Sequence, residues 1–133
     1  MVVNLITMEF ADSQALGNLG EAAALGYLGE KGYRPLARNW RHGHGEIDLI
    51  LRDDSTLIFV EVRARSCGAK VPPYESIRKH KWRVLRRTAL AYYRRLYWRP
   101  KTLRFDVVAV HHQAGMIQDI RHYENVGLFG RYV

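Results

Sequence analysis

Four charged residues recur at the spacing of a strand in two neighbouring apolar segments. Glu46 and Asp48 lie two residues apart in the first segment, and Glu61 and Arg63 lie two residues apart in the second. Because side chains alternate along a strand, each pair occupies one face of its strand. Burying such charges is costly unless they are paired or bind an ion. These residues are therefore the first candidates for chemistry.

The break between the two segments determines whether the carboxylates meet. A two-residue hairpin turn at Asp54 and Ser55 pairs Asp53 with Thr56. Continued along both strands, this register predicts two further pairs, Asp48 with Glu61 and Glu46 with Arg63. Three carboxylates then converge on one spot.

Like charges opposite one another destabilise a sheet unless something neutralises them. A divalent cation does so, because Mg²⁺ takes oxygen ligands from one or two carboxylates and leaves other positions to water and a substrate phosphate. The spacing therefore predicts a Mg²⁺ or Mn²⁺ site. A structural cluster, in which Glu46 pairs with Arg63 and Asp48 pairs with a nearby basic residue, remains the alternative.

The elements that must position these residues follow from hydrophobic periodicity and turn signals. A first helix with an apolar stripe is expected over Ser13 to about Lys31, with Gly32 as its stop and Glu21 on its flank. A second helix, with Trp82, Leu85, Ala89, Tyr92 and Leu96 as its stripe, ends before Pro100. The expected strands are Pro35–Arg41, Gly45–Leu51, Leu57–Arg65, Leu103–Val110 and Met116–His122, the first three forming an antiparallel meander. The pattern predicts an α/β domain of order α-β-β-β-α-β-β.

The chain has 133 residues and 15.5 kDa, enough for one domain. We expect a loose lead-in over residues 1–12 and a single domain over 13–133. No stretch is apolar enough for a membrane span, and the single Cys67 excludes an internal disulfide. These features favour a cytoplasmic protein.

The charge is strongly basic and localised. Lys and Arg total 21 against 13 acidic residues, giving a net charge of +8, and the segment Arg78–Lys101 contains ten of the basic residues and no acidic one. This pattern favours a polyanion, with nucleic acid first, although a solvated face or a membrane-surface helix is the alternative. The expected nucleic-acid contacts are Lys79, Lys81, Arg83, Arg86, Arg87, Arg94 and Arg65. Outside the apolar stripe, Tyr93, Tyr97 and Trp98 are candidates for base stacking, and none of the six histidines is assigned a role.

Several segments, in order over about Leu16 to Val110, resemble the YraN-like family of predicted endonucleases, which is similar to the restriction-endonuclease-like (Holliday-junction-resolvase-like) superfamily. The matching segments are Gly20–Ala23, Ala37–Arg41, Gly45–Ile50, Phe59–Ser66 and Arg104–Val108. The resemblance implies a restriction-endonuclease-like core, a mixed sheet flanked by helices.

The resemblance also implies roles for individual residues. Asp48 and Glu61 would bind the metal, Glu21 would be a third acidic contributor, and Arg63 would occupy the position of the superfamily's lysine. Arginine does not lose its proton, so Arg63 cannot act as a general base, although its donors can stabilise a phosphoryl transition state. Lys79 or Lys81 is a candidate for the missing ammonium.

The function expected from the sequence is a Mg²⁺- or Mn²⁺-dependent endonuclease that hydrolyses phosphodiesters in DNA, with branched or damaged DNA among the candidate substrates. Asp48, Glu61 and Arg63 are the expected catalytic residues, and Asp48, Glu61, Glu21 and Glu46 the expected metal ligands. The alternatives are a catalytically inactive nucleic-acid-binding module and a basic subunit of a repair or recombination assembly. A homodimer would suit symmetric cutting of two strands, and the sequence leaves the oligomeric state open.

Overall fold

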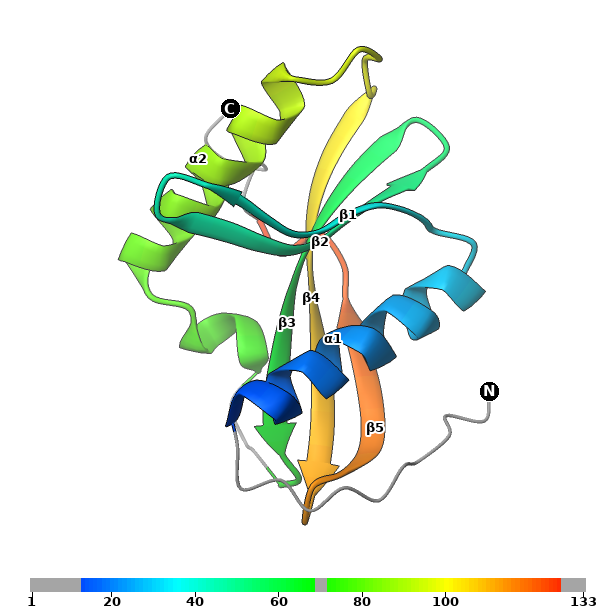
Figure 1. Ribbon diagram of the computed structural model, residues 1–133, viewed down its shortest axis with the longest axis vertical. Helices are drawn as coiled ribbons and strands as arrows, with labels where there is room; N and C mark the ends of the chain where they lie inside the picture. The colour runs from blue at the N-terminus through cyan, green and yellow to red at the C-terminus, as the bar shows by residue number, and fades with distance from the viewer. Residues whose placement is uncertain (1–12, 69–71, 128–133) are drawn as a thin grey trace.

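The structure, a computed structural model, describes residues 13–68 and 72–127. Along these residues the order of elements confirms the predicted α-β-β-β-α-β-β arrangement, with a short 3₁₀ helix added before the second α-helix (Figure 1). The expected lead-in over residues 1–12 lies outside the described part. The elements are α1 (Ser13–Glu30), β1 (Arg34–His42), β2 (Gly45–Asp53), β3 (Thr56–Ser66), η1 (Pro73–Ser76), α2 (Lys79–Arg94), β4 (Thr102–Gln113) and β5 (Met116–Tyr123).

The strands form one mixed sheet of order β1-β2-β3-β4-β5. The first three strands are an antiparallel meander, as expected, and β5 is antiparallel to β4. Strands β3 and β4 are parallel, and the crossover between them carries η1 and α2. A parallel pair needs such a crossover, because its strands run in the same direction. The connection therefore brings the basic helix against the sheet that carries the acidic residues.

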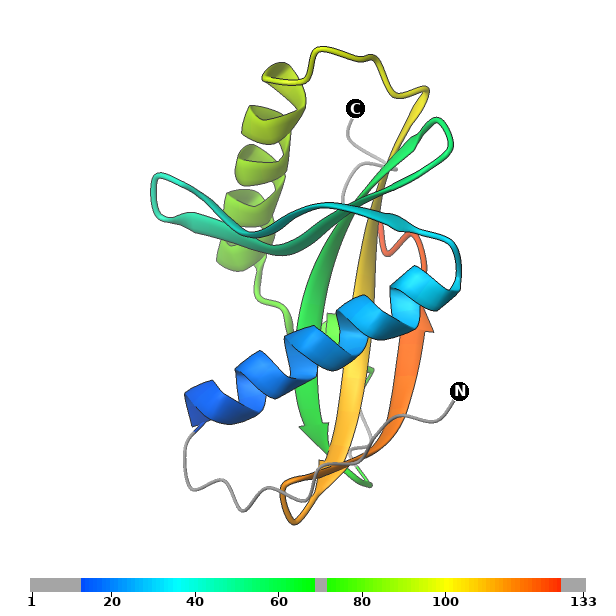
Figure 2. The ribbon, with the colours of Figure 1, turned by 45° about the vertical axis from the view of Figure 1, so that its right-hand side comes forward.

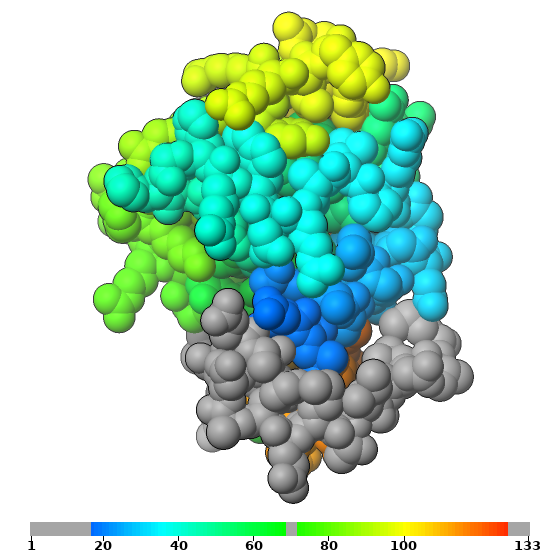
Figure 3. Space-filling model, viewed as in Figure 1, coloured from blue at the N-terminus to red at the C-terminus, as the bar shows by residue number. Residues whose placement is uncertain are grey.

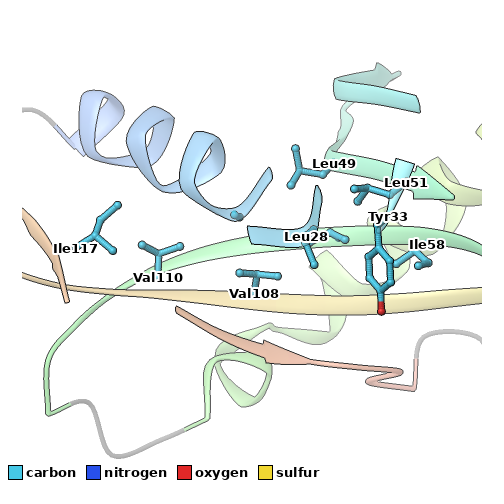
Figure 4. Packing of buried hydrophobic residues seen from close by; sticks show 10 residues of the cluster. Leu28, Tyr33, Leu49, Leu51, Ile58, Val108, Val110 and Ile117 are labelled. Atoms are coloured by element: carbon cyan, nitrogen blue, oxygen red, sulfur yellow. The ribbon is translucent and has the colours of Figure 1, made fainter. Parts of the chain in front are cut away.

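Alternate residues of the central strands pack on opposite faces of the sheet. Phe59 and Phe105 belong to a core beneath α2, which contributes Leu85, while Ile58 and Val108 belong to a second core beneath α1. Figure 4 shows this second cluster at the end of α1, with Leu28 above β3 and β4. Strands buried on both faces need apolar residues at nearly every position, which explains their sequences.

The β1–β2 hairpin separates from β3 partway along the sheet. Asp53 pairs with Thr56, as predicted, and the pairing between β2 and β3 continues to Leu49 and Val60 and ends there. Beyond that point β2 pairs with β1, while β3 continues beside β4. Figure 2 shows the β1–β2 hairpin leaving the other strands and extending toward α2. The acidic residues lie around this divergence.

Gly45 fixes the far end of the β1–β2 hairpin against α2. A Cβ at this position would overlap the Thr88 hydroxyl and approach Val84 to 3.1 Å. Thr88 is itself held by a hydrogen bond from its hydroxyl to the Val84 carbonyl oxygen. Only glycine permits the backbone to come this close, so this contact helps to place β2 relative to α2.

The second helix is shorter than the periodicity predicts. It ends at Arg94, and the N–H of Arg95 bonds back to the Tyr92 carbonyl oxygen at 3.0 Å, so the last turn tightens before the chain leaves the helix. Leu96 and Trp98 still pack against the core from the segment that follows. The apolar pattern therefore continued past the helix because core contacts continued. In the described residues, no helix is long and apolar enough to cross a membrane.

Candidate active site

Asp48 lies where β2 and β3 separate and bridges the gap with its side chain. The backbone N–H of Val62 donates a hydrogen bond to Asp48 Oδ2 at 2.8 Å, in place of a backbone ladder bond. Asp48 also interacts through a hydrogen bond with the carboxyl group of Glu61, which is only 3% exposed. The expected meeting of Asp48 and Glu61 is confirmed, although it is a contact between side chains across diverging strands.

The surroundings of Asp48 disfavour its ionised form. Burial raises the pKa of Asp48 to about 8, and repulsion by the Glu61 carboxylate, the hydrogen bond with Glu61 and the charge of Glu21 act in the same direction. The Val62 N–H opposes this rise in the pKa. Two carboxyl groups in close contact do not readily ionise together, because like charges at this separation repel each other. Asp48 therefore keeps a proton near neutral pH.

Two basic side chains face the same carboxylate from different elements. Lys81 at the start of α2 places Nζ 2.6 Å from Glu61 Oε2, and Arg63 on β3 places Nε 3.7 Å from the same oxygen. The Arg63 Nε is buried and, among the described residues, has no hydrogen-bond partner. Of the two lysines suggested by the sequence, Lys81 contacts the acidic pair. The parallel crossover explains this contact, since it returns the chain to the sheet at the start of α2.

Glu21 and Glu46 lie together beside this pair. Asn39 Nδ2 donates to Glu21 Oε1 at 2.6 Å and lies 3.1 Å from Glu46 Oε1, while Arg41 Nε donates to Glu46 Oε2 at 2.8 Å. An open cleft of about 340 Å³ is lined by Gly17, Asn18, Glu21, Asn39, Arg41 and Glu46. Asn39 adopts a positive φ of 50°, a conformation that asparagine tolerates better than most residues.

The predicted pairing of Glu46 with Arg63 is wrong. The β2–β3 ladder ends at Leu49, so Glu46 is opposite Arg41 on β1 and forms its ion pair there. The hairpin register was extended through residues that belong to a diverging part of the sheet. Glu46 is therefore separated from the Asp48–Glu61 contact by its own pairing, and it lines the adjacent cleft with Glu21.

The contact between Asp48 and Glu61 provides two carboxyl groups, which is fewer ligands than a closed all-protein metal cage needs. Among residues 13–68 and 72–127, no group of three or more His, Cys, Asp or Glu side chains is arranged to hold a metal ion. Mg²⁺ and Mn²⁺ sites often use only one or two carboxylates and leave the remaining positions to water and phosphate. A cation between these two carboxyl groups would displace the retained proton and relieve their repulsion.

The basic residues of α2 divide into two groups. Lys81, at the start of the helix, faces Glu61, whereas Arg83, Arg87 and Arg94 follow a helical stripe on the side opposite the buried Leu85 and Ala89. Arg83, Arg86, Arg87, Leu90 and Arg94 line a groove of about 190 Å³. Of the other expected contacts, Lys79 is exposed at the first residue of α2, and Arg65 lies at the end of β3 in register with His111.

A second buried cluster, which the sequence did not predict, is centred on Asp106 of β4. Arg104 binds its carboxylate with two hydrogen bonds of 2.8 and 2.9 Å, His122 Nε2 lies 2.7 Å from Oδ2, and the N–H of Asn125 donates to Oδ1 at 2.9 Å. Arg104 also donates to the Tyr33 hydroxyl at 2.9 Å. The available signal was an aspartate inside an otherwise apolar strand. No local pattern indicated that a histidine from the next strand would bind it.

The burial of Asp106 has the opposite outcome to that of Asp48. Burial alone would raise the pKa of Asp106, but hydrogen bonds from His122 and Arg104, a backbone hydrogen bond and the positive charge of Arg104 outweigh it, so the pKa is lowered. The assignment of no role to any histidine is therefore wrong for His122, whose side chain is 1% exposed and ties β5 to β4. This cluster stabilises the fold and leaves no open coordination position.

Comparison with known proteins supports the family suggested by the motifs. The model of a family described as "Uncharacterised protein family UPF0102" matches residues 20–110. A UPF0102 protein of Geotalea uraniireducens is 36% identical over 115 residues, covering 86% of this chain and 91% of the relative. One from Symbiobacterium thermophilum is 45% identical over 98 residues, covering 74% and 83%.

Among solved structures, that of Pyrococcus furiosus SfsA in complex with Ca²⁺ is similar at a TM-score of 0.41 and 14% identity, covering 89% of this chain and 66% of the other. The matched residues include α1 from Gly20, the Asp48–Glu61 pair with Lys81 and Arg63 beside it, and β4 as far as Val110. From these sequence matches, the chain belongs to the UPF0102 family, which is the YraN-like family of the sequence analysis.

Proposed function

We propose that this protein is a Mg²⁺- or Mn²⁺-dependent endonuclease that hydrolyses phosphodiester bonds in DNA. The carrying observation is the contact between the buried Glu61 and Asp48, whose pKa is raised to about 8, with Lys81 and Arg63 beside it. Strongly perturbed carboxyl groups beside specific charge partners are typical of functional sites. In this proposal, the five-stranded sheet with its two helices is a restriction-endonuclease-like core.

Asp48 and Glu61 would hold the cation, with Glu21 and Glu46 at the adjoining cleft as ligands through water or substrate. When bound there, the metal lowers the pKa of a coordinated water and neutralises charge on the scissile phosphate. Glu61 already has Lys81 and Arg63 beside it, so the protein's own task is to hold Asp48 against Glu61 in a fixed orientation. The Val62 N–H serves this task through its hydrogen bond to Asp48 Oδ2.

Lys81 and Arg63 divide the work that a single lysine performs in the superfamily motif. The Lys81 ammonium at 2.6 Å orients Glu61 and is available to a phosphate oxygen that enters beside it. A guanidinium group is a poor general base, so Arg63 has the role of stabilising developing negative charge. Its buried Nε, which has no hydrogen-bond partner in the described residues, provides a donor for that purpose.

The test is cleavage of labelled linear, forked and four-way DNA in the presence of Mn²⁺. Asp48→Asn removes the ionisable group and keeps the shape, so we expect cleavage to fall by at least about a hundredfold while DNA binding remains. Asp53→Asn, at the exposed end of the same strand, is the matched control and should cut like the parent. Cleavage surviving equally in Asp48→Asn would overturn the proposal.

A second set of variants tests the divided role. Lys81→Ala and Arg63→Ala should each reduce cleavage, and Arg63→Lys should lose much of the activity if the planar guanidinium is the clamp. One observation favours a catalytically inactive DNA-binding module instead, because Lys81 and Arg63 together neutralise Glu61 as a structural cluster would. No cutting by any form, with DNA binding unchanged throughout, would support that module.

A further inference from the structure

The arginine stripe of α2 faces a different direction from the acidic site. Leu85 and Ala89 are buried against the sheet, and Arg83, Arg87 and Arg94 lie about half a helical turn around from them. Lys81, which contacts Glu61, lies near the buried side. The acidic pair and the arginine stripe therefore lie on different sides of the same helix. A ligand bound along the stripe would therefore use a different segment from one bound at the acidic pair.

The charge of this surface is unbalanced within the described part of the chain. Arg83, Arg87 and Arg94 form no ion pair with any described residue, and the groove that they line with Arg86 has Leu90 in it. The segment after α2 adds Arg95, Arg99 and Lys101, all exposed. Like charges along one helix face repel one another unless a polyanion neutralises them. The complementary partner is a chain of phosphates.

The segment that follows α2 carries an exposed aromatic ring three residues after Arg94. Tyr97 is 96% exposed and is the one large hydrophobic side chain exposed to this degree in the described residues. The neighbouring rings have cations over them, since Arg52 lies 3.8 Å from the centroid of Trp98 and Arg99 lies 5.8 Å from that of Tyr93. Figure 3 shows the segment between α2 and β4, in yellow-green and yellow, forming the upper rim of the molecule.

We propose that the outer face of α2 and the segment after it bind a single strand of nucleic acid, with an unpaired base stacked on Tyr97. An exposed phenol ring stacks on a base only when that base is free of its duplex neighbours. Guanidinium groups, in contrast, donate hydrogen bonds to the phosphates of single strands and of duplexes alike. A ring combined with an arginine stripe therefore selects an unpaired strand. This inference deepens the proposed function by specifying DNA that has a single-stranded segment.

The length of the stripe gives the size of the site. Arg83 and Arg94 are 11 positions apart in α2, which is about 16 Å along the helix axis. The phosphates of one strand in a duplex are about 3.4 Å apart along the axis, and those of an extended unpaired strand are further apart, so the stripe spans at most about five phosphates, with Tyr97 beyond Arg94. We expect the stripe and Tyr97 together to contact no more than about eight nucleotides.

The test is fluorescence anisotropy with labelled oligothymidylates of 4, 8 and 12 nucleotides and a matched duplex, without divalent metal. Affinity should rise from 4 to 8 nucleotides and then level off. Tyr97→Ala should weaken single-strand binding by about five- to a hundredfold and leave duplex binding nearly unchanged, and Tyr97→Phe should keep both. Because Tyr97 is almost fully exposed, these variants should fold like the parent.

Charge variants separate the stripe from general attraction. The Arg87→Ala, Arg94→Ala double variant should reduce the salt slope of single-strand binding by about 1.4, while Arg121→Ala on β5 should change it little. Equal effects of Tyr97→Ala on single strand and duplex, or none on either, would overturn the inference. So would stronger binding of a polyglutamate peptide or anionic vesicles than of the oligothymidylate, since these polyanions have no bases.

The failure of this inference is distinguishable from the failure of the proposed function. Asp48→Asn should bind the oligothymidylates like the parent, because the acidic pair lies on another side of α2. Loss of cleavage with retained Tyr97-dependent binding supports both statements. Tyr97-dependent binding by a protein that cuts no substrate supports the docking surface alone.

Discussion

Asp48 on β2 and Asp106 on β4 are both carboxylates placed within apolar strands, and their surroundings differ in charge. Asp106 receives Arg104, His122 and a backbone N–H, so its pKa is lowered, whereas Asp48 lies against Glu61, so its pKa is raised to about 8. The first environment stabilises a carboxylate, and the second destabilises one. Burial alone therefore does not decide whether a carboxyl group in this sheet is ionised. The charges of the groups around it do.

The largest expected effect comes from breaking the neutralised cluster. Asp106→Ala would leave Arg104 buried without its carboxylate and should reduce the free energy of unfolding by about 3–5 kcal/mol, measured by urea denaturation. Asp119→Ala is the matched control, because it breaks the exposed pair with Arg121 and should change the free energy of unfolding little. Similar losses in both variants would show that the cluster is no more stabilising than a surface ion pair.

Asp106 should also contribute to the dependence of the unfolding free energy on pH at low pH. Because its folded-state pKa lies below the ordinary value, Asp106 contributes stability above about pH 4, and this contribution is lost as the pH falls through the lowered pKa. Asp106→Ala should therefore have a flatter dependence of unfolding free energy on pH below about pH 4.

An intermediate effect is expected from relieving the crowded pair. Between about pH 4 and pH 8, Asp48 keeps its proton in the folded protein but has lost it in the unfolded chain. The free energy of unfolding without metal should therefore fall as the pH rises through this range. Asp48→Asn lacks this dependence. At pH 8 it should be more stable than the metal-free parent by at least about 1.4 kcal/mol, the equivalent of one pKa unit.

The affinity for a metal ion should depend on the same proton of Asp48. Mn²⁺ affinity, measured by calorimetry, should increase about tenfold per pH unit up to about pH 8 and then level off, because the cation displaces the proton of Asp48. Asp48→Asn should lose the site. A Mn²⁺ affinity that is independent of pH from 6 to 8 would contradict the assignment of this pair as the metal site.

The smallest effect concerns the rim of the neutralised cluster. The Tyr33 hydroxyl accepts from Arg104 and donates to Glu124 Oε1 at 3.1 Å, so Tyr33→Phe should lower the unfolding free energy by about 1 kcal/mol. Tyr27→Phe is the control, and thermal denaturation of both variants provides the measurement. A loss in Tyr33→Phe as large as that in Asp106→Ala would show that the network fails as a unit.

Local pattern was enough to determine the elements and the central carboxylate contact. The apolar runs around Leu49 and Val60 predicted two strands covered on both faces, and the turn at Asp54 fixed the register that brings Asp48 to Glu61. These predictions succeeded because strand alternation and a two-residue hairpin act over a few bonds. The basic composition of α2 was likewise visible along the chain.

Tertiary structure alone decided which charges meet across elements. The divergence of β2 from β3 moved Glu46 to Arg41, the parallel crossover brought Lys81 to Glu61, and the β4–β5 pairing carried His122 to Asp106. The Lys81 contact depends on strand order and crossover geometry, and the Glu46 contact depends on which neighbouring strand β2 stays paired with at that end. Spacing along the chain decides neither. The sequence by itself therefore determined that charged side chains would lie within this sheet. The three-dimensional arrangement determined that Asp106 lies against Arg104 and His122, whereas Asp48 lies against Glu61. The two pKa values shift in opposite directions because each depends on its neighbours in space.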